Sequence, residues 1–269
     1  MPESLSPLVW RDSRRLTGPN LLLDGPGAAL EVSLEGGRED ELVAAWLVHA
    51  RAMLDAVGWA DERLAVRRFA GGASLAVSAP VDGLYAATLV TEWACDAVLG
   101  TAADLDATAA KIREEIEADR DPQLLALMAG AAEHGVTCIE GDRRVSVGLG
   151  SGSRTWRGRL PAPDELDWST IHDVPVILVT GTNGKSTTVR LLAAIARAAG
   201  RTAGLSSSDW VRVGDDILDR GDYSGPGGAR LVLRDSRVEL AVLEIARGGI
   251  LRRGLPVTYD RIIECLRDD

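Results

Sequence analysis

The sequence predicts an α/β protein in which an α+β domain of about 150 residues precedes a parallel sheet with flanking helices. Two observations predict the sheet. The continuous apolar run Val176–Val179 leads directly into a helical pattern, and a second apolar strand follows at Glu239–Leu243. Strand and helix patterns interspersed before residue 150 predict the α+β domain. We therefore expect domains at 1–150 and 174–269, joined by a linker at 151–173.

In the N-terminal domain, strand and helix patterns are bounded by turn and capping residues. Apolar residues at helical spacing from Leu42 to Val57 predict a helix that Asp40 opens and Gly58 closes. Gly71 and Gly72 suit the turn of a hairpin. The expected elements are a strand at 28–34, a helix at 40–57, strands at 64–69 and 74–78, helices at 85–99, 105–116 and 121–135, and strands at 136–139 and 144–147.

Composition is typical of a globular protein and argues against two classes of partner. The 269 residues are 46% hydrophobic and 26% charged, with a net charge of −10. A nucleic-acid-binding protein would carry clustered basic residues instead, and no run of about 18 apolar residues predicts a membrane span. We expect a cytoplasmic protein that binds neither nucleic acid nor a membrane. Its three cysteines and three histidines are scattered, which gives no basis for a disulfide framework or a zinc site.

Two interpretations fit the glycine-rich segment Gly148–Ser153. The regular pattern is lost from there to Asp173, and Pro161 and Pro163 interrupt a polar stretch, which favours a linker. The alternative is that the glycines cradle a phosphate. No strand-to-helix context supports that alternative, so the glycine spacing alone is weak evidence for it.

The segment Thr180-Gly-Thr-Asn-Gly-Lys-Ser-Thr-Thr188 lies between the expected buried strand and the following helix. Its glycines allow backbone N–H groups to point at phosphate oxygens, and the helix N-terminus adds positive potential. Lys185 is one of only two lysines among 30 basic residues, so its presence here invites a functional reason. The common phosphate-loop template has glycine where this chain has Val179. A glycine-rich turn with an incidental lysine is the alternative.

The helix after this loop is expected to bury one apolar side. Gly200 stands where a helix would stop. The residues assigned to the apolar side are Val189, Leu192, Ile195 and Ala199.

This loop resembles the ATP-binding loop of the Mur ligase superfamily, enzymes that join a carboxylate to an amine through an acyl phosphate. The segments Gly221–Pro226, Leu231–Asp235 and Val242–Leu251 look like the Mur-type module of cyanophycin synthetases. Arg14–Asn20 looks like the start of the N-terminal domain of the same family. The resemblance is strong over 175–255 and weak before 150.

The resemblance implies ATP and Mg²⁺ as ligands and a peptide or amino-acid carboxylate as substrate. Lys185 would stabilise charge on the transferred phosphoryl group, while Ser186 and Glu244 would hold magnesium. Arg247 would contact the substrate carboxylate, although a structural role is equally open. An ion pair with Arg247 or Arg252 is the alternative for Glu244. The residues implied to hold the nucleotide are Gly181, Thr182, Asn183, Gly184, Lys185, Ser186 and Thr187.

Two departures from the family bear on activity. Cyanophycin synthetases carry an ATP-grasp domain between their N-terminal and Mur-like parts, where this chain has only the segment 151–173. The family also has further strands and a C-terminal domain beyond the Mur-like residues seen here. We therefore expect an ATP-dependent acid–amino acid ligase of the Mur type, with a partial central domain that does not complete amide formation alone. A homo-oligomer, or a partner that supplies the missing domain, would fit this expectation.

Two other functions stay open at this point. One is a truncated or regulatory relative that binds nucleotide without ligase turnover. The other is a small P-loop kinase or GTPase. The short loop counts against the second, as does a strand that ends in Glu244 rather than in the aspartate such enzymes use for magnesium.

Overall fold

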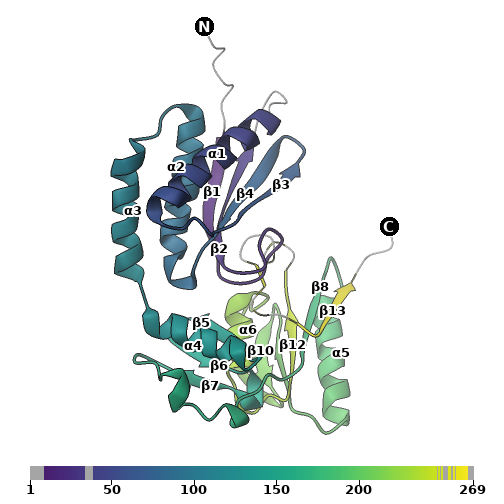
Figure 1. Ribbon diagram of the computed structural model, residues 1–269. Helices are drawn as coiled ribbons and strands as arrows, with labels where there is room; N and C mark the ends of the chain where they lie inside the picture. Colours follow the sequence, from purple (N-terminus) through teal and green to yellow (C-terminus); the bar gives the residue numbers. More distant parts are fainter. Residues whose placement is uncertain are drawn as a thin grey trace. The chain divides into compact units, whose positions relative to one another are not determined.

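The computed structural model describes residues 9–33, 39–246, 248, 250, 254–255, 257 and 259–265 of the chain (Figure 1). The chain divides into two compact units. The first comprises Met1–Arg120 with Arg252–Gly254, and the second comprises Asp121–Leu251 with Leu255–Asp269. The predicted mixed α/β class is confirmed, because helices and several sheets are both present. Within the described ranges, no helix combines the length and apolar character needed to cross a membrane.

Within the described residues, the first unit is a four-stranded antiparallel sheet with three α-helices and one short 3-10 helix, Val81–Gly83 (Figure 1). Its helices match the predicted ones to within a few residues, and the hairpin predicted at Gly71 is present. The predicted strand at 28–34 is β2, and its last residue lies outside the described residues. The strands in sheet order are β1 (Val9–Leu16), β2 (Gly27–Ser33), β4 (Gly72–Ser78) and β3 (Leu64–Phe69), and the helices are α1 (Glu39–Val57), α2 (Leu84–Leu99) and α3 (Leu105–Asp119).

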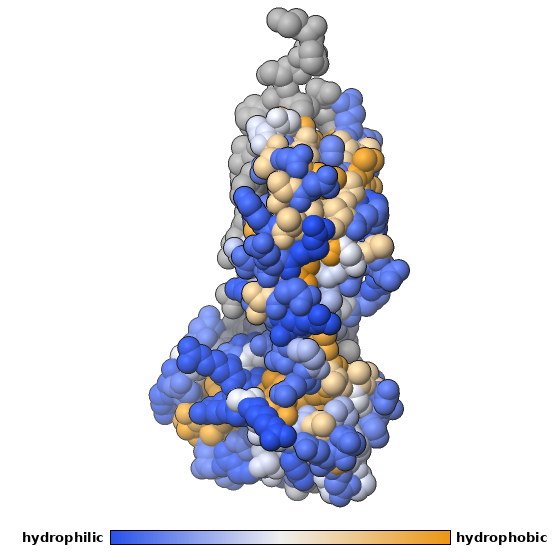
Figure 2. All heavy atoms as spheres, turned by 60° about the vertical axis from the view of Figure 1, so that its left-hand side comes forward, coloured by the Kyte–Doolittle hydropathy of each residue, from blue (hydrophilic) through white to orange (hydrophobic). Residues whose placement is uncertain are grey.

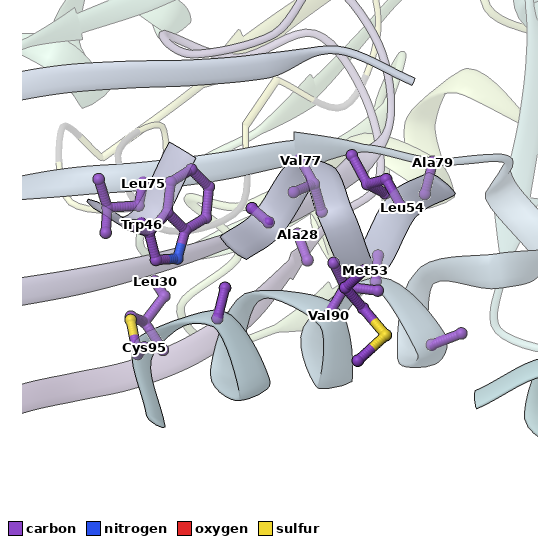
Figure 3. Close-up of a cluster of buried hydrophobic side chains, with 14 of the residues drawn as sticks. Ala28, Leu30, Trp46, Met53, Leu54, Leu75, Val77, Ala79, Val90 and Cys95 are labelled. Carbon is purple, nitrogen blue, oxygen red and sulfur yellow. The ribbon is translucent and has the colours of Figure 1, made fainter. Parts of the chain in front are cut away.

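The core of this unit lies between the helices and one face of the sheet (Figure 3). Trp46 and Leu54 of α1 are fully buried, together with Leu75 of β4. The indole N–H of Trp46 donates to the carbonyl oxygen of Thr91 at 3.4 Å, so this polar group is satisfied inside the core. Burial among apolar side chains raises the pKa of the Cys95 thiol to about 12. The amphipathic pattern read from the sequence therefore identified the core-facing side of α1.

The second unit is built on a six-stranded sheet with the order β11-β10-β9-β12-β8-β13. The neighbouring strands β9, β12, β8 and β13 are parallel to one another, as the sequence predicted for β8 and β12. The expected parallel sheet is corrected at the other edge, where β10 and β11 form an antiparallel extension. The bounds are β8 (Val176–Gly181), β9 (Ala203–Ser206), β10 (Trp210–Val213), β11 (Asp216–Arg220), β12 (Leu240–Glu244) and β13 (Arg261–Cys265).

Helices pack on both faces of this sheet, because the side chains that its central strands direct to the two sides are apolar on both. Val176 and Leu178 belong to the cluster that contains α6 (Pro226–Leu233), whereas Val179 packs in the cluster that contains α5 (Lys185–Ala198). A strand covered on both faces reads as the continuous apolar run seen in the sequence.

The predicted apolar side of α5 is partly wrong. Val189, Ala193 and Ala196 are the buried residues of this helix, whereas Ile195 is 57% exposed and Ala199 is exposed just after the helix ends. The buried positions are spaced by four and three residues, which places them on one stripe, and alanines in that stripe leave room for the sheet. Ile195 falls outside the stripe.

Figure 2 shows one face of the molecule, on which hydrophilic residues predominate and apolar residues form smaller areas between them.

A small three-stranded sheet also belongs to the second unit, with α4 beside it. Its strands are β5 (Cys138–Gly141), β6 (Arg144–Val147) and β7 (Arg154–Trp156), and α4 spans Pro122–Glu133. The sequence predicted β5, β6 and α4, including the Asp121 cap, whose side chain accepts the N–H of Leu124 at 2.9 Å. β7 was not predicted.

Arg230 of α6 and Arg234, the residue that follows this helix, fix the β5–β6 hairpin to the main sheet. The buried guanidinium of Arg234 donates to Ser146 Oγ, Ile139 O and Arg144 O, each at 3.1 Å. Arg230 donates to both carboxylate oxygens of Asp142, at 2.6 and 3.0 Å, and holds the pKa of that carboxyl below its usual value. The hairpin is therefore part of the second unit's structure.

The glycine-rich segment Gly148–Ser153 is packed against the protein. The N–H groups of residues 148, 149 and 151 donate to the carbonyl oxygens of Thr137, His172 and Val238 at 2.8, 3.0 and 2.7 Å. A Cβ on Gly150 would lie 2.4 Å from the Val238 oxygen. The phosphate-cradle alternative is therefore wrong, because these donors are already used and the glycines serve close packing.

The segment 151–173, expected to be a linker, contains regular and buried structure. It includes β7 and two short 3-10 helices, Pro163–Glu165 and Trp168–Thr170, and it buries Leu160 and Ile171. Such short elements have no periodicity that a sequence pattern can detect. The domain boundary at residue 150 stays a prediction, whereas the compact units divide after Arg120.

Cutting the chain at each position distinguishes these two boundaries. We expect the polypeptide 121–269 to unfold cooperatively in urea. In 151–269, we expect a loss of about 3 kcal/mol or more, because Arg234 loses its hydrogen bonds to Ile139, Arg144 and Ser146, and a hydrogen bond of a charged group contributes about 1.5 to 3 kcal/mol. Circular dichroism during urea titration measures both. Equal stability of the two polypeptides would favour the boundary at 150.

A candidate phosphate-binding site

The loop between β8 and α5 has the backbone geometry that its glycines predict. Gly181 ends β8 with φ +125°, and Gly184 has φ +81° at the N-cap position of α5. Both values lie in a region that residues with a side chain rarely adopt. A Cβ on Gly181 would lie 1.9 Å from the carbonyl oxygen of Cys265, which also accepts the Thr182 N–H at 3.0 Å. β13 therefore supports the loop from behind.

An open depression of about 370 Å³ lies at this loop and at the carboxyl end of the parallel strands. Six of the seven residues implied to hold the nucleotide line it, together with Glu244; Gly181 does not. Ser208, Ser224 and Ala246 were not predicted as site residues. The lining residues are Thr182, Asn183, Gly184, Lys185, Ser186, Thr187, Ser208, Ser224, Glu244 and Ala246.

Glu244 is the most unusual group at the depression, because a carboxylate is rarely buried. It is only 3% exposed. Its Oε2 accepts the Ser186 hydroxyl at 2.8 Å and the Ser208 N–H at 3.4 Å. No basic side chain pairs with it among the residues that the structure describes. Arg247 and Arg252 lie outside those residues, so the alternative ion pairs of Glu244 stay open.

Lys185 lies in the first turn of α5 and is half-buried. Its Nζ is 3.5 Å from the carbonyl oxygen of Thr182, which is the outer limit of a hydrogen bond. The ammonium group is thus held only weakly by the protein. It lies beside a helix N-terminus, where the backbone already favours an anion.

The oxygen ligands at the depression suit a hard cation. Mg²⁺ is typically bound by one or two protein oxygens together with substrate phosphates and water. Ser186 and Glu244 are within 2.8 Å of one another and supply two such oxygens, one of them on a buried carboxylate. No cluster of three or more His, Cys, Asp or Glu side chains suited to a metal occurs within the described ranges. Any Mg²⁺ held here would therefore rely on phosphate oxygens as well.

Ser208 and Ser224 could not be found by the sequence analysis for different reasons. Ser208 follows β9, a strand that was not predicted, so its position at the carboxyl end of a parallel strand was not recognised. Ser224 lies within the segment Gly221–Pro226 that carried the family resemblance, but no chemical role was assigned to it.

Comparisons with known proteins identify relatives for part of the chain. The chain is 55% identical over 82 residues to a cyanophycin synthetase of Geminocystis herdmanii and 54% identical over 82 residues to that of a Synechocystis species. Each match covers 30% of this chain and 9% of the relative. A UDP-N-acetylmuramoylalanine–D-glutamate ligase of Synechococcus elongatus is 56% identical over 39 residues, 14% of this chain and 8% of the relative. No family model matches the chain.

Part of this chain is homologous to cyanophycin synthetases and to a Mur ligase. The resemblance stated from the sequence is thereby confirmed. The matched residues make up less than a tenth of the length of these relatives, so the activity of the whole relatives is not transferred by the match alone.

The two loop glycines should respond differently to alanine. Gly184→Ala adds a Cβ in open space, so we expect only the cost of a positive φ, about 1 to 2 kcal/mol. Gly181→Ala adds a Cβ against the backbone of β13 and should destabilise the protein by roughly 3 kcal/mol or more. Chemical denaturation of both variants measures the difference. Equal losses would contradict the close packing of Gly181 against Cys265.

Proposed function

We propose that this chain contributes the nucleotide-binding part of an ATP-dependent carboxylate–amine ligase of the Mur type, related to cyanophycin synthetase. The observation that carries the proposal is the buried Glu244 carboxylate, 2.8 Å from a serine of a strand–loop–helix phosphate loop. The homology to two kinds of ligase supports the reaction class. ATP, Mg²⁺ and a peptide or amino-acid carboxylate are the proposed ligands.

The proposed reaction has two steps. An oxygen of the substrate carboxylate attacks the γ-phosphorus of ATP, the bond to the β–γ bridging oxygen breaks, and ADP leaves. The amine of the second substrate then attacks the carbonyl carbon of the acyl phosphate, loses a proton and expels phosphate, which leaves an amide. Phosphoryl transfer of this kind depends on positioning and on charge stabilisation.

The residues of the loop have distinct roles in this proposal. The N–H groups at the start of α5 bind phosphate oxygens, and Lys185 stabilises the charge on the transferred group. Ser186 and Glu244 hold Mg²⁺, which neutralises the phosphate charge when it is bound. Arg247, proposed to bind the substrate carboxylate, lies outside the described residues, so its role rests on the resemblance alone.

Binding of ATP tests the proposal most directly. We expect Lys185→Ala to weaken ATP binding about tenfold or more, because a charge-assisted contact to phosphate contributes roughly 1.5 to 3 kcal/mol. Lys111→Ala is the matched control, since Lys111 is the other lysine and is exposed on α3. Isothermal titration calorimetry gives both affinities. Equal affinity of the Lys185 variant and the wild type would overturn this assignment.

The wild-type protein distinguishes the open functions when ADP formation is followed, because ADP leaves in the first step even if no amide is formed. ADP formation that requires both Mg²⁺ and an amino-acid or peptide carboxylate supports a ligase. Tight ATP binding without ADP formation under any substrate would favour a nucleotide-binding relative without turnover.

Magnesium dependence tests Glu244. We expect Glu244→Gln to lose most of the Mg²⁺ enhancement of ATP binding, about tenfold, because the amide keeps the shape of the side chain but not its charge. Affinities are measured with excess Mg²⁺ and with chelator present. Glu140→Gln, at an exposed carboxylate of β5, is the control. An unchanged Mg²⁺ dependence in Glu244→Gln would indicate that Glu244 has a structural role and does not hold Mg²⁺.

A further inference from the structure

If the proposed function is correct, the Ser186 hydroxyl group contacts the cation through its oxygen and also needs an acceptor for its proton. In the structure this hydroxyl donates its single proton to Glu244 Oε2 at 2.8 Å. A serine hydroxyl carries one proton and two acceptor lone pairs. When its oxygen faces a cation, the O–H bond points away from the cation. When Oε2 of Glu244 also faces the cation, the oxygen that accepts this proton in the structure is turned toward the cation instead.

Ser208 provides another acceptor for this proton. The Ser208 Oγ is 3.3 Å from the Ser186 Oγ, and both side chains line the same depression. The N–H of Ser208 donates to Glu244 Oε2 at 3.4 Å. Ser208 therefore contacts both residues proposed to hold the cation, through its side chain toward one and through its backbone toward the other.

The backbone around Ser208 is held in place from several directions. On one side, Tyr223 donates its N–H to Ser207 O at 2.9 Å. On the other, the Asp209 carbonyl oxygen accepts the Gly221 N–H at 2.9 Å. Hydrogen bonds to both neighbours restrict the position of the residue between them.

The side chain of Arg190 adds a further constraint on this loop. Arg190 lies one turn after Ser186 on α5 and pairs with the carboxylate of Asp209. Its guanidinium also lies over the ring of Trp210, 4.4 Å from the ring centroid. The loop that carries Ser208 is thus connected to the same helix that carries Ser186.

We propose that Ser208 is a positioning residue for the cation site: it accepts the Ser186 hydroxyl proton and thereby leaves Glu244 available to the cation. This inference deepens the proposed function and rests on it. Under this inference, the Ser208 hydroxyl contributes to nucleotide binding only when the cation is bound. The residue should matter when Mg²⁺ is present with the nucleotide and should be dispensable when it is absent.

Three variants test this assignment. Ser208→Ala removes the acceptor, Ser208→Thr keeps a hydroxyl, and Ser169→Ala removes a hydroxyl bonded to the exposed Asp167 carboxylate as a matched control. Isothermal titration calorimetry with ADP is carried out with excess Mg²⁺ and with chelator, which gives the Mg²⁺ enhancement of each protein without any turnover. Thermal unfolding of each variant reports the effect on folding.

We expect Ser208→Ala to lower the Mg²⁺ enhancement by about 2- to 10-fold, the effect of one hydrogen bond, with no change in the affinity measured in chelator. Ser208→Thr should restore the enhancement, and Ser169→Ala should leave it at the wild-type value.

Two results would overturn the inference while leaving the proposed function intact. One is an unchanged enhancement in Ser208→Ala. The other is an equal loss of affinity with and without Mg²⁺, which would indicate a direct nucleotide contact or a general structural effect. A wild-type protein whose nucleotide affinity does not depend on Mg²⁺ would instead overturn both this inference and the magnesium part of the proposed function.

Discussion

Parallel pairing of β12 with β8 determines the composition of the candidate site. In this register Glu244 is opposite Val179, and the N–H after Glu244 donates to the Val179 carbonyl oxygen at 2.9 Å. Because both strands run the same way, the end of β12 meets the loop that follows β8. A change of register by one residue would turn the Glu244 side chain to the opposite face. The contact between Ser186 and Glu244, 58 residues apart, depends on this pairing.

The burial of Glu244 carries the strongest functional information in the structure. Transfer of a carboxylate from water to the protein interior is costly unless charges or hydrogen bonds compensate for it. Its contacts among the described residues are a hydroxyl and a backbone N–H, both uncharged. Neutral donors stabilise a carboxylate less than an arginine would. A cation is the partner that would complete this environment, and the depression leaves room for one beside Ser186.

The position of Ser224, which lines the depression, depends on structure that lies away from the loop between β8 and α5. Ser224 lines the depression and is followed closely by α6. Arg230 of α6 and Arg234 just after it are bonded to the β5–β6 hairpin. The Ser224 carbonyl oxygen also accepts the N–H of Ala246, just past the end of β12. The position of Ser224 is therefore coupled to both the central strand and the small sheet. The segment that looked like a linker in the sequence belongs to the same unit as this sheet.

Sequence alone determined the parts of this protein that repeat a local pattern. The long helices of the first unit, β8, and the glycine-rich loop with Lys185 and Ser186 all have a periodicity or a motif contained in a short stretch of chain. β1 was missed because charged residues interrupt its alternation: Arg11, Asp12, Arg14 and Arg15.

Tertiary structure alone decided the remaining features, since each depends on residues far apart in the chain. β9 and β10 were not predicted, and their place in the sheet comes from hydrogen bonds to other strands. Ile195 is exposed because the sheet contacts a different stripe of α5 than the sequence suggested. Ser208 reaches Ser186 and Glu244 only when three separate elements meet at the carboxyl edge of the sheet, and no local pattern contains that information.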